Sequence, residues 1–329
     1  MTLAPIAVLI TDIYKMKRFV FILSALLFLA GCTIDSPVIY DPDLRILFQP
    51  ETYRHVVDED EDIYPGEQDF AVCAWASGKQ WLKLSRAYRQ EISLTDTLRK
   101  VQVKDSLWTF AEEVLWPGKN EVVSFAAYSP YQAGCAISED KGVQWSTDVL
   151  EDQTDLLYSH KDVDRRDNVD ANVVHLSFSH ALCQIGFRVK NRVDNTGALD
   201  ALNRPDKITI KKITIDGVKH KGSFRSLPSA EWTLQEDKAA LPIFEGLFQT
   251  SGIPEPIGTV WLMVPQTFDT TITVEFQYTT FENTTITQVL KTVPMKTKLE
   301  NGRNYTYTLS VGIDDVKFLQ ELIEEDLVK

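Results

Sequence analysis

Apolar and polar residues alternate along most of this chain, which is the pattern of half-buried β-strands. The alternation is clearest over residues 174–178, 183–189, 208–215, 272–278 and 305–311. Between the first two of these segments the apolar positions change parity near His180. This predicts a bend or bulge, because a one-residue shift reverses the buried face. Turn signals such as Pro117-Gly118 and Asp216-Gly217 separate the segments. Many short strands with such turns predict an all-β protein built from β-sandwiches.

The C-terminal segment, residues 314–329, departs from this alternation. Its apolar residues recur at helical spacing among Glu, Lys and Gln residues, at Val316, Leu319, Ile323 and Leu327. An apolar stripe with this spacing is typical of an amphipathic helix. We therefore predict a short C-terminal helical tail.

The N-terminus has the parts of an export signal. Three basic residues precede a short apolar run, Phe19–Ala30. The run is shorter than the roughly 20 residues that cross a bilayer, and a basic segment followed by a short apolar one is typical of a secretory signal peptide. It ends in Leu-Ala-Gly-Cys32, which resembles a bacterial lipobox, where the chain is cut before a lipidated cysteine. We predict acyl chains on Cys32. A buried helix that ends in an unmodified cysteine is the alternative.

Composition narrows the functional classes. The chain has 329 residues, with 47 Asp and Glu against 34 Lys and Arg and a formal net charge of −13. This balance argues against a nucleic-acid binder, because neutralising phosphates requires clustered basic residues. The hydrophobic fraction of 44% and the charged fraction of 25% are ordinary for a globular protein, which argues against wholesale disorder and against a multi-span membrane protein.

The length predicts two domains, at roughly 150 residues each, after the signal peptide. We predict a signal peptide at 1–31, a tether at 32–44, β-sandwiches at 45–170 and 171–313, and the helical tail at 314–329. The boundary is placed at the charged stretch 161–168, because exposed polar segments are where domains join and proteases cut. Limited trypsin is expected to cut first at Arg165 or Arg166. Met16 is an alternative start to Met1.

The sequence lacks the motifs of common enzyme classes, namely GxSxG, Walker, GxGxxG and HExxH. The three cysteines after Cys32 are odd in number and widely spaced, which predicts buried free thiols. His175 and His180 are five residues apart rather than four, so a structural imidazole is favoured over a zinc ligand. The acidic run 58–62 lacks the spacing of a calcium loop and predicts a solvated loop. We predict no catalytic residue, no cofactor and no metal site.

Five short segments occur along the chain in a recognisable order. They are 123–131 (VSFAAYSPY), 154–157 (TDLL), 176–185 (LSFSHALCQI), 264–266 (VPQ) and 301–307 (NGRNYTY). With the lipobox, this ordered set resembles the Bacteroidetes fimbrillin family over most of the chain from Cys32 to about Ile313. The resemblance implies two tandem transthyretin-like antiparallel β-sandwiches, export as an outer-membrane lipoprotein, and a place as stalk, anchor or tip subunit of a type V pilus.

The same resemblance implies a non-catalytic, lipid-anchored fimbrial subunit or fimbria-associated adhesin at the cell surface. In type V pilins an Arg-specific protease removes an N-terminal segment, and a strand of an incoming subunit fills the groove that opens. Arg45, before Ile-Leu-Phe, is the first candidate cut site and Arg54 the second. Other fimbrial subunits would then be partners by strand addition. The predicted helical tail departs from the alternation that a donor strand needs. The alternative is a non-polymerising surface lipoprotein that binds a glycan or a host protein.

Overall fold

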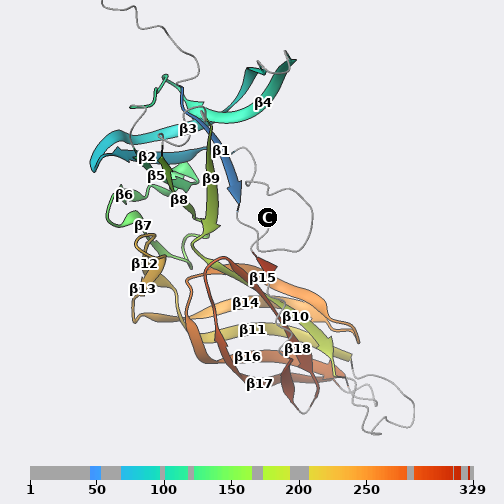
Figure 1. Cartoon of the computed structure of the whole chain (residues 1–329). Coiled ribbons are helices and arrows are strands. Elements are labelled where there is room, and N and C mark those ends of the chain that lie inside the picture. The colour runs from blue at the N-terminus through green and yellow to red at the C-terminus, as the bar shows by residue number, and fades with distance from the viewer. Residues whose placement is uncertain are drawn as a thin grey trace, which may run out of the picture. The chain divides into compact units, whose positions relative to one another are not determined.

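Segments rich in β-branched and aromatic residues form strands in the computed structural model of this chain (Figure 1). The structure describes residues 45–52, 68–96, 101–117, 122–164, 173–192, 207–279, 285–313, 315–319 and 325–326. Within these ranges every regular element is a strand except η2 (Tyr131–Ala133), one turn of 3-10 helix. None of the described residues forms an apolar helix of the length that a bilayer crossing requires. The all-β fold class is confirmed.

Seven strands of the first half close into a barrel with the order β1-β4-β3-β2-β5-β8-β9. They are β1 (Leu47–Thr52), β2 (Phe70–Ala76), β3 (Lys79–Asp96), β4 (Val101–Phe110), β5 (Val122–Ser129), β8 (Leu157–Asp164) and β9 (Val173–His180). The pairing of β1 with β9 completes the ring and removes both sheet edges. The interior is an aromatic core that includes the fully buried Phe48, Phe70, Phe125 and Phe178.

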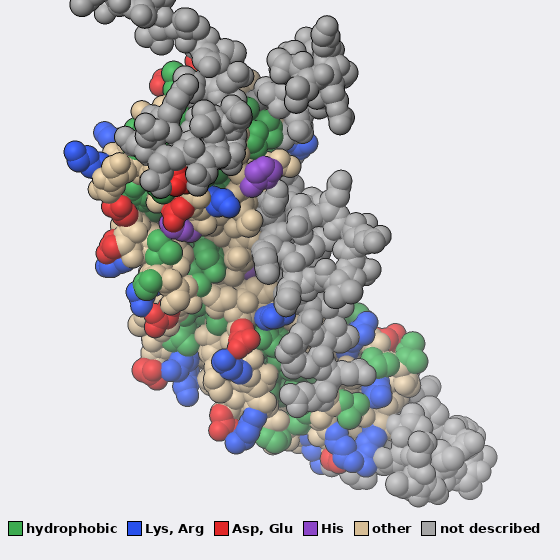
Figure 2. Space-filling model, viewed as in Figure 1, with side chains coloured by type: hydrophobic (Ala, Val, Ile, Leu, Met, Phe, Trp, Pro, Cys, Tyr) green, Lys and Arg blue, Asp and Glu red, His purple; other side chains and the backbone are tan. Residues whose placement is uncertain are grey.

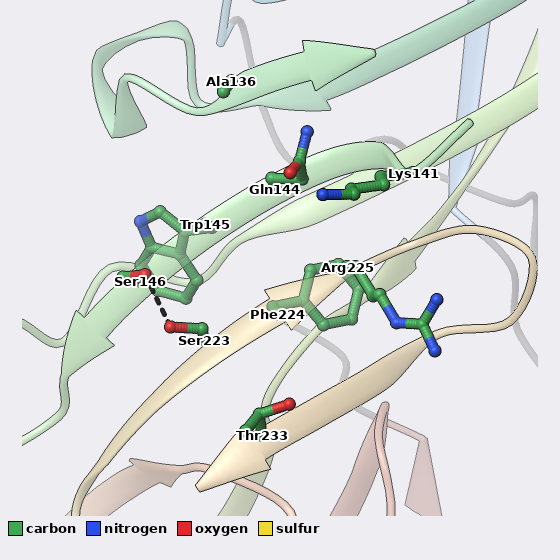
Figure 3. Close-up of a pocket in the computed structure, with 9 residues that line it drawn as sticks. All are labelled: Ala136, Lys141, Gln144, Trp145, Ser146, Ser223, Phe224, Arg225 and Thr233. Atoms are coloured by element: carbon green, nitrogen blue, oxygen red, sulfur yellow. Dashed lines mark hydrogen bonds between the residues drawn. The ribbon is translucent and has the colours of Figure 1, made fainter. Parts of the chain in front are cut away.

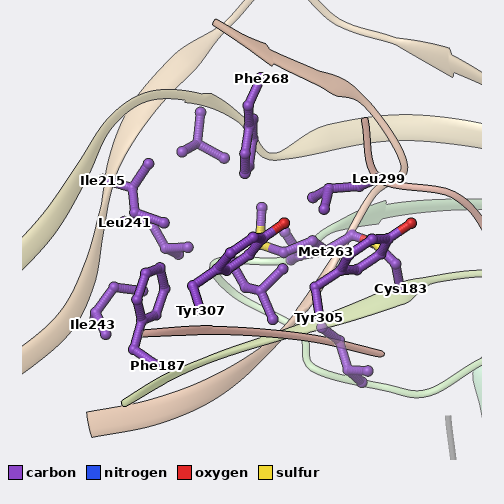
Figure 4. Close-up of a cluster of buried hydrophobic side chains, with 14 of the residues drawn as sticks. Cys183, Phe187, Ile215, Leu241, Ile243, Met263, Phe268, Leu299, Tyr305 and Tyr307 are labelled. Atoms are coloured by element: carbon purple, nitrogen blue, oxygen red, sulfur yellow. The ribbon is translucent and has the colours of Figure 1, made fainter. Parts of the chain in front are cut away.

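Two further sheets share one core in the second half, with the orders β15-β10-β18-β19 and β14-β11-β16-β17; β20 also pairs with β18. Their strands are β10 (Cys183–Asn191), β11 (Lys207–Lys219), β14 (Lys238–Gln249), β15 (Glu255–Met263), β16 (Thr267–Thr279), β17 (Thr285–Lys298), β18 (Arg303–Val311), β19 (Val316–Leu319) and β20 (Glu325–Asp326). Figure 4 shows side chains of both sheets meeting around Phe187, Ile243 and Tyr307. Two packed sheets with a shared core form a β-sandwich.

A smaller sheet, β13-β12-β7-β6, joins two hairpins that are far apart in the sequence. Its strands are β6 (Ala136–Ser138), β7 (Gly142–Asp148), β12 (Lys221–Arg225) and β13 (Glu231–Leu234). In register, Phe224 on β12 lies between Trp145 on β7 and Trp232 on β13. These three side chains pack into the core cluster of the second half. The alternate residues of the same strands therefore lie on the outer face of this small sheet.

Two of the pairings depart from the purely antiparallel sheets expected from the sequence. β1 and β9 run parallel, from Leu47 opposite Val173 to Thr52 opposite Phe178. β10 and β18 also run parallel. Parallel neighbours cannot be joined by a short hairpin, so strands from distant parts of the chain must meet at both places. Local patterning does not reveal that kind of pairing.

The predicted bend near His180 is confirmed. β9 ends at His180 in the barrel, and β10 begins at Cys183 in the second-half sandwich. Ala181 and Leu182, between the two strands, are fully buried in the larger core cluster. β9 therefore lies in the barrel although it follows residue 170. The domain boundary near residue 170 stays a prediction, and the expected trypsin sites at 165–166 lie outside the described residues.

The predicted C-terminal helix is wrong where the structure describes this segment. β19 pairs antiparallel with β18 along its whole length, and β20 pairs with the other end of β18. Val316 is buried opposite Val311, and the Phe318 ring lies 5.2 Å from the Tyr307 ring. Helix propensity is a weak prior, and a vacant edge of β18 offers hydrogen bonds and apolar contacts that an isolated helix does not have.

Candidate functional site

β1 closes the barrel by pairing with two strands that are far apart in the sequence. It lies between β4 and β9, and its register with β9 extends over six residue pairs. Its pairing with β4 is much shorter, with Phe48 opposite Trp108 and an isolated bridge between Arg45 and Leu115. Pro50 within β1 has no N–H to donate to a neighbouring strand. β1 therefore completes the barrel but pairs with β4 over a much shorter length than with β9.

One side chain anchors β1 to the barrel core. Phe48 has no exposed area, and its ring meets three others edge-on, at centroid distances of 5.7 Å to Phe70, 5.5 Å to Phe110 and 5.8 Å to Phe125. Edge-to-face aromatic pairs stabilise a core beyond the area that they bury. Loss of β1 from this position would therefore leave an aromatic pocket flanked by the backbones of β4 and β9.

Arg45, the first candidate cut site, lies at the start of this strand and is only half-exposed. Its Nη2 donates to Thr109 Oγ1 at 3.3 Å, and its buried Nε has no hydrogen-bond partner among the described residues. The next residue, Ile46, is fully buried, and its N–H donates to Val114 O at 3.0 Å. The Arg45–Ile46 peptide bond is thus built into the barrel wall, and a protease that binds an extended segment can reach it only after local opening.

The other site residues expected from the sequence lie outside the described residues. Cys32 precedes the first described residue, and Arg54 follows the end of β1 by two positions. The chain order still fixes what each cut would do. A cut after Arg45 leaves β1 joined to the rest of the chain, whereas a cut after Arg54 separates β1 covalently from the remaining barrel strands.

The histidine and cysteine side chains have structural surroundings. His180 is buried, with Nδ1 2.9 Å from Asp155 Oδ1, as expected for a satisfied imidazole. Cys73, Cys135 and Cys183 are free and buried, as predicted. Burial raises the pKa of Cys135 to about 12, so this thiol stays protonated and unreactive at neutral pH. Among the described residues, no three His, Cys, Asp or Glu side chains are arranged to hold a metal ion.

One charged cluster was not predicted from the sequence. His220 is buried beside Asp148, with Nδ1 2.6 Å from Oδ1, and Lys221 lies 3.4 Å from the same carboxylate and 3.3 Å from Asp237. Burial alone would raise the pKa of Asp148. The hydrogen bonds from His220, from the Leu150 N–H and from Lys221 outweigh it and lower the pKa. The cluster joins the end of β7 to the start of β12, 72 residues apart, so only the fold brings its members together.

The outer face of the small sheet was also not predicted as a site. It is hollowed over about 640 Å³. Polar side chains of β7, β12 and β13 line the hollow together with Lys141 from the β6–β7 turn and the apolar Ala136, Trp145 and Phe224 (Figure 3). The period-two positions of Ser146 and Ser223, each next to a buried aromatic residue, are the sequence signal for this face. Elsewhere, acidic and basic side chains are interspersed over much of the surface seen in Figure 2.

Comparison with known families agrees with this structure. The model of a prokaryotic membrane lipoprotein lipid attachment site matches residues 16–33, which defines a lipid-anchored, all-β surface protein. The fimbrillin-like family model matches residues 59–324, which is most of the chain, so the chain belongs to the fimbrillin-like family. The resemblance seen in the sequence and the expected membrane-anchored location at the cell surface or on a fimbria are confirmed. No curated protein matches the chain.

Solved structures from Bacteroides and Porphyromonas species align with this chain. A candidate cell adhesion protein of Bacteroides ovatus aligns with a TM-score of 0.53 at 15% identity, over 87% of this chain and 98% of its own. One of Bacteroides uniformis aligns with a TM-score of 0.52 at 12% identity, over 85% and 98%. The fimbrial anchor protein Mfa2 of Porphyromonas gingivalis gives a TM-score of 0.39 at 11% identity, over 85% and 99%. At these identities the first two alignments show the fold alone.

Proposed function

We propose that this lipid-anchored fimbrillin-like protein joins other fimbrial subunits by strand addition, at the position that β1 fills in the described structure. The observation that carries the proposal is the placement of β1 between β4 and β9 with Phe48 in an aromatic pocket. Loss of β1 would leave unpaired N–H and C=O groups on two strands beside an apolar pocket. An extended segment of another chain binds such a groove by backbone hydrogen bonds and by side chains that enter its pockets.

We further propose that cleavage after Arg54, rather than after Arg45, starts assembly. This order reverses the one expected from the sequence. A cut after Arg45 requires local opening of the barrel wall and leaves β1 in place by a covalent connection. A cut after Arg54 places β1 on a separate peptide that is retained by noncovalent contacts alone, chiefly the β9 pairing and the Phe48 pocket. A covalently free strand can then be exchanged for one from another subunit.

The C-terminal segment supports a donor role better than the sequence indicated. Residues 316–319 form a strand in this structure, so the predicted helix no longer argues against strand donation. Two tandem transthyretin-like domains, with a boundary near residue 170, remain part of the proposal. A closed barrel followed by a β-sandwich is compatible with them. We propose a non-catalytic role, which membership of the fimbrillin-like family supports.

The test uses the purified chain without its lipid, treated with an Arg-specific protease. The proposal expects a new N-terminus at His55 and oligomers that resist SDS. Arg54→Lys should prevent both results because it removes the cut site and keeps the charge. Arg45→Lys, the matched control, should leave both unchanged. Oligomers from a product that begins at Ile46 would instead identify Arg45 as the site. A stable monomer after complete cleavage would refute strand addition and favour the non-polymerising lipoprotein that binds a glycan or a host protein.

A further inference from the structure

The outer face of the small sheet has a regular arrangement of hydroxyl groups. In register, Ser146 on β7 lies opposite Ser223 on β12, and Ser223 lies opposite Thr233 on β13. The two serine Oγ atoms are 2.8 Å apart. Neighbouring strands are roughly 4.8 Å apart, so three hydroxyls form a row across the sheet. Each hydroxyl both donates and accepts hydrogen bonds, and the three residues are exposed.

The layer beneath this row is rigid. Phe224, under the row, packs against Trp232 at 5.4 Å and against Tyr158 at 5.0 Å, and Trp232 meets Trp145 at 6.0 Å. Trp232 Nε1 also donates to Ala181 O at 2.7 Å, which ties the sheet to the link between β9 and β10. A site on a packed sheet loses little conformational freedom when it binds a ligand.

Two cationic side chains border the hydroxyl row. Lys141 comes from the turn before β7, and in Figure 3 its ammonium group lies over the hollow near Gln144. The pKa of the neighbouring Asp140 is lowered by a hydrogen bond from Ser138 and also by the charge of Lys141. Arg225, two positions along β12 from Ser223 and on the same face, forms an ion pair with Glu231 through Nη2 and donates to Leu227 O through Nη1 at 3.4 Å. A guanidinium has five N–H donors, so these two contacts fix its orientation and leave other donors available.

We propose that this outer face binds an acidic glycan. The carboxylate of a sugar acid would contact Lys141 and the remaining donors of Arg225, and sugar hydroxyls would bond the row of Ser146, Ser223 and Thr233. The choice of an acidic ligand rests on the charged residues that line the hollow, which are Lys141 and Arg225 and are both cationic. A hydroxyl-rich ligand fits because the exposed groups of the row are hydroxyls rather than apolar side chains. The proposal rests on the surface location of the protein and not on strand addition.

The test is a glycan array that holds uronic-acid and sialic-acid glycans together with neutral glycans of matching length. It is probed with the intact, uncleaved chain without its lipid. We expect acidic glycans to be retained at least ten-fold more strongly than neutral ones. The Lys141→Ala/Arg225→Ala double variant should lose at least ten-fold in binding, and Ser223→Ala should weaken binding of the same glycans. Lys296→Ala, which removes an exposed lysine paired with Asp269 on a different sheet, should bind like the parent chain.

All four altered side chains are exposed, so the substitutions should change the thermal unfolding temperature little. A thermal unfolding curve of each variant will show that it is folded. The proposal is overturned if the array retains no glycan, if neutral glycans bind as strongly as acidic ones, or if the folded double variant binds like the parent chain. Because the chain is uncleaved in this assay, failure of strand addition would not affect the result, and failure here would leave strand addition standing.

Discussion

Phe48→Ala tests whether β1 is held in the barrel by its aromatic anchor. The side chain is fully buried and meets three rings edge-on. Truncation removes about 2–3 kcal/mol of transfer free energy and adds the cost of a cavity, so Phe→Ala substitutions in cores cost about 3–5 kcal/mol. The three ring contacts place this site in the upper part of that range. We expect the free energy of unfolding of the barrel to fall by about 4 kcal/mol.

The same change should also release β1. If the open state is one in which β1 has left the barrel, a loss of about 4 kcal/mol raises its population by up to about a thousand-fold, since each 1.4 kcal/mol is a factor of ten. Cleavage after Arg45 requires this opening, so its rate should rise with the open population. N-terminal sequencing of timed digests identifies the cut, and urea unfolding followed by tryptophan fluorescence gives the change in stability.

Gln49→Ala is the matched control, because Gln49 is exposed on the same strand. It should change stability by less than about 0.5 kcal/mol and leave the cleavage rate unchanged. The reasoning is refuted if Phe48→Ala costs less than about 1 kcal/mol. It is also refuted if the two variants are cut after Arg45 at the same rate, since the anchor would then not control access to this bond.

Three further predictions concern the anchor, the domain boundary and the charged cluster. Cys32→Ala should move the protein from the detergent-extracted membrane fraction to the soluble fraction and abolish palmitate labelling. Limited trypsin should cut the folded chain first at Arg165 or Arg166, and N-terminal sequencing of the fragments checks this. The pKa of Asp148 is lowered from its ordinary value of 3.8, so its contribution to stability is complete above that value and is lost as the pH falls through the folded pKa. Asp148→Asn should therefore flatten the acid limb of a stability–pH curve.

The local pattern predicted most strands because a half-buried strand leaves a period-two signal in its own residues. The segment 174–189 shows this well, since its change of parity near His180 marks the passage from the barrel to the next sheet. The C-terminal segment shows the limit. Val316 and Leu319 have helical spacing, yet both lie in a strand because the edge of β18 was available to pair. Spacing describes one segment, whereas pairing depends on two.

The sequence by itself determined the export and anchoring signal, the all-β class and the family, because each is written in contiguous residues or in their order. Only the tertiary structure decided that β1 closes a barrel in parallel with β9, and that Ser146, Ser223 and Thr233 form one row. The residues that these arrangements bring together are between 10 and 126 positions apart in the sequence. Hydrogen bonds and ring contacts between such distant residues form only after the chain has folded, so no local pattern encodes them.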